Sequence, residues 1–200
     1  MKKTNFAAAA IAAAALLGAT AAQAEDGNWY VSAGGGANWI GDQSSNGVTA
    51  DYDAGYTVLG AVGYDFGDSE TGSFRVEGEI SWTKNDVDQV TINGVNANIG
   101  GDTEQWGFMM NALYDFMPGS SFRPYIGAGL GVVDGETELN RAGVTVSGNS
   151  TEFAYRGLVG VGIGLGENTT LDLGYRHTRV TGDNDDFGNN TVIAQVRFGL

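Results

Sequence analysis

The sequence contains no cysteine and only two prolines among its 200 residues. Without cysteine there is neither a disulfide framework nor a thiolate metal site, so an exported protein of this length must be held together by backbone pairing and packing. Basic residues are scarce as well, because 10 Lys and Arg stand against 24 Asp and Glu and give a net charge of −14. Neutralising phosphates requires clustered bases, so this composition argues against a nucleic-acid partner.

The first 24 residues have the composition of a secretory signal peptide. Two lysines precede an apolar run over residues 6–17, and residues 22–24 (Ala-Gln-Ala) match the small-residue pattern of a cleavage site. The alternative is an N-terminal membrane anchor, but the run is only about twelve residues long, whereas a spanning helix needs about 20. We therefore expect residues 1–24 to be cleaved during export and residues 25–200 to form one domain.

The rest of the chain is organised by an alternation of period two, interrupted by stretches rich in Gly, Asn, Asp and Ser. No helical periodicity of 3.6 residues lasts more than two turns. Each alternating segment has about the 9 to 11 residues that a tilted strand needs to cross a bilayer. The pattern predicts eight strands, over residues 29–40, 55–66, 73–83, 104–116, 122–133, 152–165, 169–179 and 191–200.

The predicted connections alternate between short and long, which is typical of outer-membrane barrels with short periplasmic turns, long external loops and an even strand count. The short ones are residues 67–72, 117–121 and 166–168. The long ones are residues 41–54, 84–103, 134–151 and 180–190. The predicted fold is therefore all-β: an eight-stranded antiparallel up-and-down transmembrane β-barrel with short periplasmic turns and four long extracellular loops.

The two faces of the predicted strands differ in composition. One parity is bulky and apolar, and the other mixes charge with many of the 33 glycines, where average usage of about 7% would give roughly 14. A soluble, lipocalin-like barrel is the alternative, but it would leave these glycines on a wet outer surface, where they weaken strands and pack against nothing. The narrow lumen of an eight-stranded membrane barrel needs small residues beside charged ones. We therefore predict that the bulky face contacts lipid.

Five of the seven arginines fall on the inner parity. An arginine that faces lipid at mid-depth costs about 2 to 4 kcal/mol, so a membrane barrel has to turn these side chains inward. Pairing across two short turns predicts Asp65 opposite Arg75 and Asp115 opposite Arg123. With Asp172 and Arg197, these residues are expected to form a neutral cluster of three acids and three bases at the periplasmic mouth, held by bidentate Arg-carboxylate bonds.

Glu77 and Glu79 lie at mid-strand, and Arg156 and Arg176 enter from the external half, so these four are expected to fill the lumen. Two acids spaced i, i+2 can instead be a general acid/base pair. No nucleophile, metal ligand set or apolar substrate cleft accompanies them, so we predict no enzyme activity, no cofactor and no metal site. The predicted lumen charge network is structural and comprises Asp65, Arg75, Glu77, Glu79, Asp115, Arg123, Arg156, Asp172, Arg176 and Arg197.

The only histidine, His177, begins the triplet His177-Thr178-Arg179 late in the chain. Lipid A deacylases of the outer membrane carry an H-x-S motif in a similar place. Here the serine is absent and His177 has the outward parity, so we interpret it as a polar rim residue that touches lipopolysaccharide. The acidic run over residues 183–186 lacks the spaced ligands and terminal glutamate of a calcium loop and is interpreted as a solvated loop tip.

Residues 123–131 (RPYIGAGLG) and 171–176 (LDLGYR) resemble the opacity-type outer membrane protein β-barrel family, which is related in architecture to the barrel of outer membrane protein A. Residues 63–66 (GYDF) and 75–79 (RVEGE) support this resemblance. It implies an eight-stranded surface protein of a double-membraned bacterium, whose relatives are described as surface antigens, adhesins or porin-like proteins. The family usually finishes on an aromatic residue that the barrel-assembly machinery reads, whereas here Leu200 is last.

The expected function is that of an integral outer-membrane surface protein with a structural and host- or environment-interaction role, whose lumen is plugged by an Arg/Asp/Glu network. The alternative is a porin-like narrow pore or a small-solute transport barrel, although a solute route would want an apolar lumen. The expected partners are outer-membrane lipid and lipopolysaccharide, the barrel-assembly machinery during insertion, and a host or environmental ligand at the loops. The barrel is expected to be monomeric. The sequence does not identify the ligand of the loops.

Overall fold

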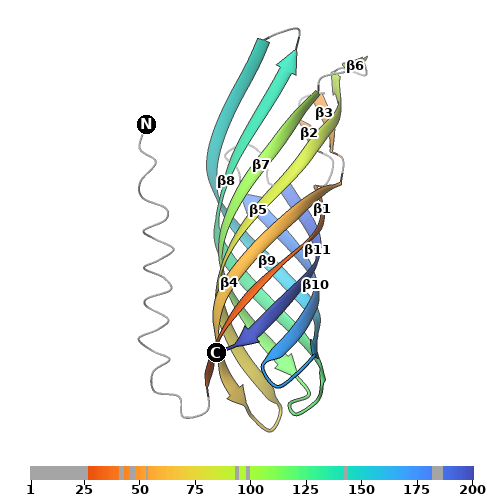
Figure 1. Cartoon of the computed structure of the whole chain (residues 1–200). Helices are drawn as coiled ribbons and strands as arrows, with labels where there is room; N and C mark the ends of the chain where they lie inside the picture. The colour runs from red at the N-terminus through yellow and green to blue at the C-terminus, as the bar shows by residue number, and fades with distance from the viewer. Residues whose placement is uncertain are drawn as a thin grey trace.

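The computed structural model describes residues 27–40, 43–45, 48–52, 54–92, 95–97, 100–141, 144–181 and 187–200. The predicted signal peptide, residues 1–24, lies outside the described residues. Within the described ranges, no helix has the length and apolar character needed to cross a bilayer. The described chain forms a tall β-barrel, drawn in Figure 1 with the three short turns and the C-terminus toward one end.

Eight strands close the barrel, and each pairs antiparallel with its neighbours in the order β1-β4-β5-β7-β8-β9-β10-β11, with β11 returning to β1. This confirms the predicted fold class. The strands are β1 (Asn28–Ile40), β4 (Gly55–Asp68), β5 (Gly72–Ile92), β7 (Gly100–Phe116), β8 (Phe122–Arg141), β9 (Val144–Gly164), β10 (Thr169–Thr181) and β11 (Phe187–Gly199).

Strands extend into all four predicted long loops, which corrects the assignment of residues 41–54, 84–103, 134–151 and 180–190. The β8–β9 ladder continues to the pair Arg141↔Val144, and β5 runs on to Ile92. The segments β2 (Gln43–Ser45), β3 (Val48–Tyr52) and β6 (Val95–Ala97) add to this extension, since β3 and β6 both pair with β5 and β2 pairs with β3. The bilayer sets a minimum strand length, but nothing at its surface obliges a hydrogen-bonded ladder to stop.

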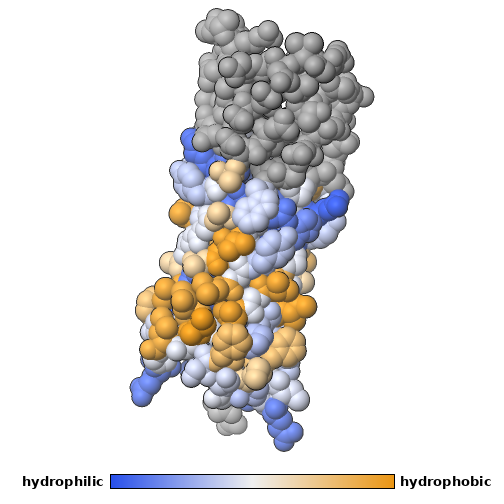
Figure 2. Space-filling model, turned by 90° about the vertical axis from the view of Figure 1, so that its right-hand side faces the viewer, coloured by the Kyte–Doolittle hydropathy of each residue, from blue (hydrophilic) through white to orange (hydrophobic). Residues whose placement is uncertain are grey.

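The bulky parity of the strands is exposed on the outside of the barrel, as predicted. Val62, Ile126 and Val159 are each about half exposed at mid-strand, with exposed fractions of 45%, 52% and 48%. Figure 2 shows the resulting apolar belt on one face of the lower part of the barrel. A soluble barrel would bury these side chains, so the exposed belt excludes the lipocalin-like alternative and matches a lipid-facing wall.

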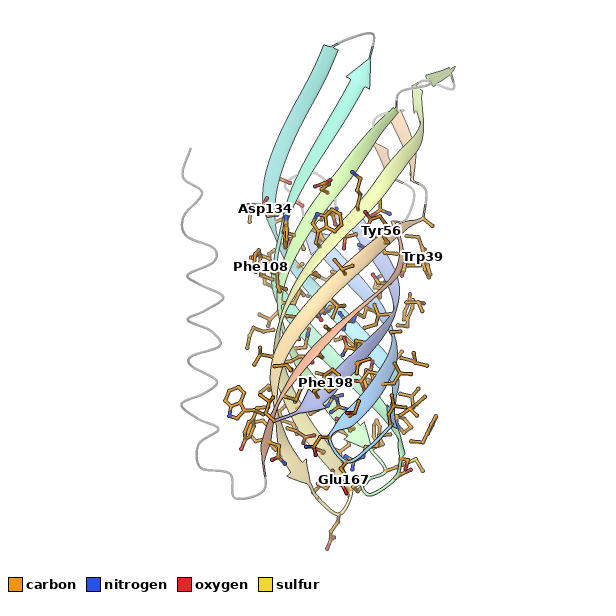
Figure 3. The ribbon with its side chains drawn as sticks, in the orientation of Figure 1. Trp39, Tyr56, Phe108, Asp134, Glu167 and Phe198 are labelled. Atoms are coloured by element: carbon orange, nitrogen blue, oxygen red, sulfur yellow. The ribbon has the colours of Figure 1, made fainter. Side chains whose placement is uncertain are left out.

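Aromatic rings border this belt at both ends. Near the short turns, Tyr64 meets Trp29 and Phe66 in edge-to-face contacts with ring centroids 5.3 and 5.0 Å apart. Tyr64 has the outward parity but is buried. Toward the external end, Tyr56 packs edge-to-face on Trp82 at 5.6 Å. Figure 3 shows Trp39 and Tyr56 in the upper half of the barrel and Phe198 in the lower half, as expected for rings that border a lipid-facing band.

Glycine and one methionine shape the short turns. Gly67 (φ 87°) lies where the β4–β5 register shifts between Asp65 and Asp68, and Gly119 (φ 74°) and Met117 (φ 60°) lie between β7 and β8. A side chain is disfavoured at these positive φ values, so glycine lets the chain reverse tightly. The turns thereby bring Asp65 and Asp68 to the mouth of the lumen.

Candidate functional site: the lumen charge network

Side chains alternate between the two faces of each strand, and the charged ones of the inner parity point into the lumen. Arg75, Glu77 and Glu79 occupy alternate positions of β5 and are all buried, with 1%, 1% and 5% of their surface exposed. Because successive side chains of a strand point to opposite faces, the apolar residues between them point outward. Counted over the described residues, four acids and four arginines are buried inside the barrel, so their formal charges cancel: Arg75, Glu77, Glu79, Asp115, Arg156, Asp172, Arg176 and Arg197.

Glu79 is the centre of the upper part of the network, which comprises Glu77, Glu79, Asn111, Arg156, Arg176 and Gln195. Its two carboxylate oxygens accept from two arginines on different strands, Oε1 from Arg156 Nη1 at 3.0 Å and Oε2 from Arg176 Nη1 at 2.6 Å. Arg156 Nε also donates to Asn111 Oδ1 at 2.9 Å, and Arg176 Nη2 donates to Gln195 Oε1 at 3.2 Å. One carboxylate thus ties β5 to β9 and β10 across the lumen.

Glu77 accepts from neutral donors. Tyr30 Oη donates to Oε2 and Asn111 Nδ2 donates to Oε1, both at 3.0 Å. Asn111 therefore joins the two glutamates, since it accepts from Arg156 on one side and donates to Glu77 on the other. Buried carboxylates with satisfied oxygens avoid much of the cost of leaving water.

The lower part of the network comprises two ion pairs, Arg75–Asp115 and Arg197–Asp172. Arg75 Nε and Nη2 donate to the two oxygens of Asp115 at 2.5 and 2.9 Å. The guanidinium carbon also lies 5.7 Å from the ring centroid of Tyr30 and 5.6 Å from that of Tyr125. Arg75 is thus held by a bidentate carboxylate and by two aromatic rings, an arrangement that suits the planar guanidinium.

Arg197 and Asp172 form a second bidentate pair beside it. Arg197 Nε and Nη2 donate to the two oxygens of Asp172 at 3.1 and 3.3 Å. The guanidinium carbon of Arg197 lies 5.4 Å from the ring centroid of Tyr30, and its Nη1 is 4.0 Å from Asp65 Oδ2. Tyr30 therefore contacts both arginines of the lower part and one glutamate of the upper part.

The predicted pair of Asp115 with Arg123 is wrong. The β7–β8 ladder places Asp115 opposite Tyr125, two residues beyond Arg123. Arg123 instead makes a bidentate pair with Asp68, through Nη1 at 2.9 Å and Nη2 at 2.8 Å, in a partly exposed position at the mouth. Residue parity survives a shift of two, so Arg123 keeps its face but lies outside the buried set.

Asp65 also differs from its predicted partnership. The register does place it opposite Arg75, but its Oδ1 accepts from Ser73 Oγ and from the backbone N–H of Gly67 at 3.0 Å. Arg75 reaches diagonally to Asp115 instead. Direct opposition across a ladder therefore did not decide which carboxylate the long guanidinium side chain binds.

Sequence reasoning missed the neutral members of the network: Tyr30, Asn111, Tyr125 and Gln195. Each lies on the inner parity of its strand and is buried. Their signal in the sequence was this parity, because a polar or phenolic side chain on the lumen face has to hydrogen-bond to a neighbour. The predicted network contained charged residues only and therefore left these four out.

Two cavities flank the network. A cavity of about 530 Å³ opens at the periplasmic mouth and is lined by Asp68, Arg123 and Arg197 among others. A smaller cavity of about 50 Å³ lies on the external side of Glu79, among threonines, with Arg156 in its wall. Arg156 Nη2 is buried without a hydrogen-bond partner. In the part of the chain that the structure describes, no group of three His, Cys, Asp or Glu side chains could hold a metal ion.

Comparison with known proteins agrees with this architecture. The profile of the family described as outer membrane protein beta-barrel domain matches residues 7–198. An outer membrane protein of Gluconacetobacter diazotrophicus is 27% identical over 169 residues, which are 72% of this chain and 44% of that protein. Outer membrane protein PagN of Salmonella typhimurium is 26% identical over 129 residues, 58% of this chain and 54% of that protein. The chain thus spans about half the length of these curated relatives.

Solved structures share the fold. Neisserial surface protein A superimposes with a TM-score of 0.60 at 22% identity, covering 88% of this chain and 100% of that one. OprG from Pseudomonas aeruginosa gives 0.58 at 13% identity, covering 88% and 96%. The attachment invasion locus protein Ail of Yersinia pestis gives 0.54 at 16% identity, covering 86% and 99%. At these identities the likeness concerns the fold alone.

Proposed function

Because the chain belongs to the outer membrane protein beta-barrel domain family and is an outer-membrane protein, we propose that its barrel is a closed support whose lumen is plugged by the charge network. The observation that carries this proposal is the pairing of Glu79 with two arginines. Its carboxylate oxygens lie 3.0 Å from Arg156 Nη1 and 2.6 Å from Arg176 Nη1. Ions would have to break these pairs in order to pass. Breaking a buried pair costs about 3 to 5 kcal/mol, which opposes spontaneous opening.

Conductance of the purified full-length protein in a planar bilayer tests this function. The wild-type barrel should give no steady current. Glu79→Gln removes the charge that holds the two arginines, so it should lower the urea midpoint of unfolding or open a steady conductance. Asp134→Asn is the control, because Asp134 lies on the outward parity of β8 and accepts from Thr151 at 2.9 Å, away from the lumen. A Glu79→Gln barrel with unchanged midpoint and no current would contradict the plug.

The alternative is a narrow pore. It is supported by the two cavities, which approach the network from opposite ends. A steady wild-type current, lost or altered in selectivity when Glu79 or Arg156 is substituted, would favour it over the plug. A route for apolar solutes is disfavoured by the eight buried charged side chains on the lumen face.

We further propose that recognition takes place outside the membrane, on the strand extensions and loops. The ladders of β5, β7, β8 and β9 continue well past the apolar belt and raise a sheet above it, as Figure 1 shows. The name of Ail, a protein of the same fold, describes an attachment and invasion locus. A variant in which residues 136–149 are replaced by a short turn should remain folded and lose adhesion to host or environmental surfaces. Retained adhesion would contradict this assignment.

The remaining expectations about partners and chemistry stay part of this proposal. We infer a monomer that contacts outer-membrane lipid and lipopolysaccharide, is inserted by the barrel-assembly machinery, and has no enzyme activity or cofactor. One observation supports the absence of hydrolytic chemistry: His177 Nδ1 lies 2.8 Å from Asn190 Oδ1, a partner that supplies no nucleophile. Hydrolysis of lipid A by the purified barrel would overturn this part.

A further inference from the structure

The outer wall of the barrel carries two basic side chains within its described part, Lys84 on β5 and Arg179 on β10. Lys84 donates to Glu104 Oε1 at 3.1 Å. Arg179 is exposed and forms no ion pair with an acid of the described residues. Five arginines lie inside the barrel or at its periplasmic mouth, each in an ion pair: Arg75, Arg123, Arg156, Arg176 and Arg197. Arg179 is therefore a cation on the wall without a counter-charge among the residues that the structure describes.

The depth of Arg179 places it at the edge of the apolar belt. On β10 the outward series begins with Leu171 and Leu173 and ends with His177 and Arg179. A strand that rises about 3.3 Å per residue and tilts by about 40° climbs roughly 20 Å between Leu171 and Arg179, close to the height of a lipid-facing band of about 25 Å. Lipid headgroups meet the wall at this level.

Arg179 belongs to a polar group that we name the outer-wall patch, defined by Tyr155, Tyr175, His177, Arg179 and Asn190. The ladders place Tyr155 opposite Arg179 and Asn190 opposite His177. Figure 2 shows hydrophilic side chains directly above the apolar belt on the side where β1, β10 and β11 lie in Figure 1. The patch is thus continuous with the surface that lipid chains cover.

Hydrogen bonds hold the patch in place. Tyr175 Oη donates to Asn190 Oδ1 at 2.6 Å, and His177 Nδ1 approaches the same oxygen at 2.8 Å. Since a carbonyl oxygen only accepts, this partner assigns the proton to Nδ1 and leaves Nε2 as an acceptor. The Asn190 amide keeps its N–H donors. The patch therefore offers donors for an anion and an acceptor for a hydroxyl group.

There is also room beside these side chains. Gly188 lies opposite Arg179 and Gly157 lies opposite His177. A Cβ at Gly157 would meet nothing within 4 Å, and one at Gly188 would come within 3.3 Å of the His177 ring. A side chain on Gly188 would crowd the flank of His177, whereas glycine leaves it open.

We propose that the outer-wall patch binds the phosphate of a phosphorylated glycolipid headgroup in the outer leaflet. Arg179 supplies the charge and a planar donor fork that matches phosphate. Asn190 adds amide donors, His177 Nε2 accepts from a sugar hydroxyl, and Tyr155 provides a ring for the sugar face. The other cation of the described outer wall, Lys84, already donates to Glu104. The proposal rests on the lipopolysaccharide contact proposed above, but it is independent of the lumen plug, since every residue of the patch lies on the opposite face of the wall.

Lipid binding to the full-length barrel in detergent micelles tests the proposal, with native mass spectrometry as the readout. The probes are lipid A bearing both phosphates and the same lipid A after enzymatic dephosphorylation. Arg179→Gln should weaken binding of the phosphorylated lipid about tenfold, as loss of a hydrogen bond to a charged group predicts. It should leave the dephosphorylated lipid unaffected. Arg179→Lys should recover part of the affinity.

Lys84→Gln is the matched control, because it changes the net charge equally at the same depth on the far wall. It should leave binding unchanged. A difference in electrophoretic mobility between unheated and heated samples verifies that each variant is folded. The proposal is overturned if Arg179→Gln binds as wild type, if both variants weaken binding equally, or if the dephosphorylated lipid binds as tightly as the phosphorylated one. Inorganic phosphate that competes at the concentration of the lipid would overturn the assignment to a lipid headgroup.

Discussion

Arg75 of β5 and Asp115 of β7 are joined by two parallel hydrogen bonds of 2.5 and 2.9 Å, although neither residue is directly opposite the other in the ladder. The register pairs Ser73 with Asp115 and Arg75 with Leu113. The guanidinium thus crosses one step diagonally to reach its carboxylate, inside a protein that places hydrophobic side chains on the lipid side. Because the interior of the barrel is charged and its outside is apolar, the stability of the barrel depends on buried ion pairs.

The first prediction concerns this pair. Asp115→Asn should lower the free energy of unfolding by about 3 to 5 kcal/mol, because Arg75 would remain buried without its counter-charge. The double variant Arg75→Met/Asp115→Leu should cost less than the single one, since it removes both charges together. Urea unfolding in lipid vesicles measures both values. A double variant less stable than Asp115→Asn would show that the two residues do not act as a pair.

The second prediction concerns the pair at the mouth. Arg123 and Asp68 are also bidentate, at 2.9 and 2.8 Å, but their side chains are 28% and 39% exposed. Water screens such a pair, so Arg123→Gln should lower the free energy of unfolding by no more than about 1 kcal/mol. The same unfolding assay applies. A loss comparable to that of Asp115→Asn would place Arg123 in the buried network after all.

The third prediction concerns the lipid-facing wall. Val62 lies on the outward parity near the middle of β4, between Tyr56 and Phe66. Val62→Arg should destabilise the inserted barrel by about 2 to 4 kcal/mol, whereas Ala37→Arg, close to Trp39 at the external end of β1, should cost about 0 to 1 kcal/mol. Unfolding from vesicles compares the two. Equal costs would mean that Val62 does not face the hydrocarbon.

The fourth prediction concerns two glycines of β9. A Cβ on Gly160 would come within 2.5 Å of the Tyr125 ring and 2.4 Å of the Leu173 carbonyl oxygen, whereas a Cβ on Gly157 meets nothing within 4 Å. Gly160→Ala should therefore lower the free energy of unfolding by about 1 to 3 kcal/mol. Gly157→Ala should be neutral or stabilising by up to about 1 kcal/mol, because alanine lowers the conformational entropy of the unfolded chain. If both variants match wild type, Tyr125 is not packed on the glycine.

Much of the fold could be predicted because the side-chain period of a strand is two. Alternation in the sequence assigned Val62 to the outside and Glu77 to the inside, and the structure has both there. This assignment needs no register, since successive residues of one strand face opposite sides whichever strand lies beside it.

The pairing of Asp115 could not be predicted in the same way. Counting outward from the β7–β8 turn gave Arg123 as its neighbour, but the ladder is displaced by two residues and Tyr125 takes that place. The five-residue connection includes Met117 and Gly119 at positive φ, and such turn geometry depends on the whole hairpin. A displacement of two preserves every inside/outside assignment, so the hydrophobic pattern offers no means of detecting it.

The sequence by itself determined the eight strands, their closure into a membrane barrel and the inward face of five arginines, because an arginine that faces lipid at mid-depth is costly. Tertiary structure alone decided that Glu79 binds Arg156 and Arg176, that Tyr30 links the two parts of the network, and that Tyr155 lies opposite Arg179. Those relationships depend on the register between strands that are distant in the chain, and on rotamers of long side chains that several neighbours compete to hold.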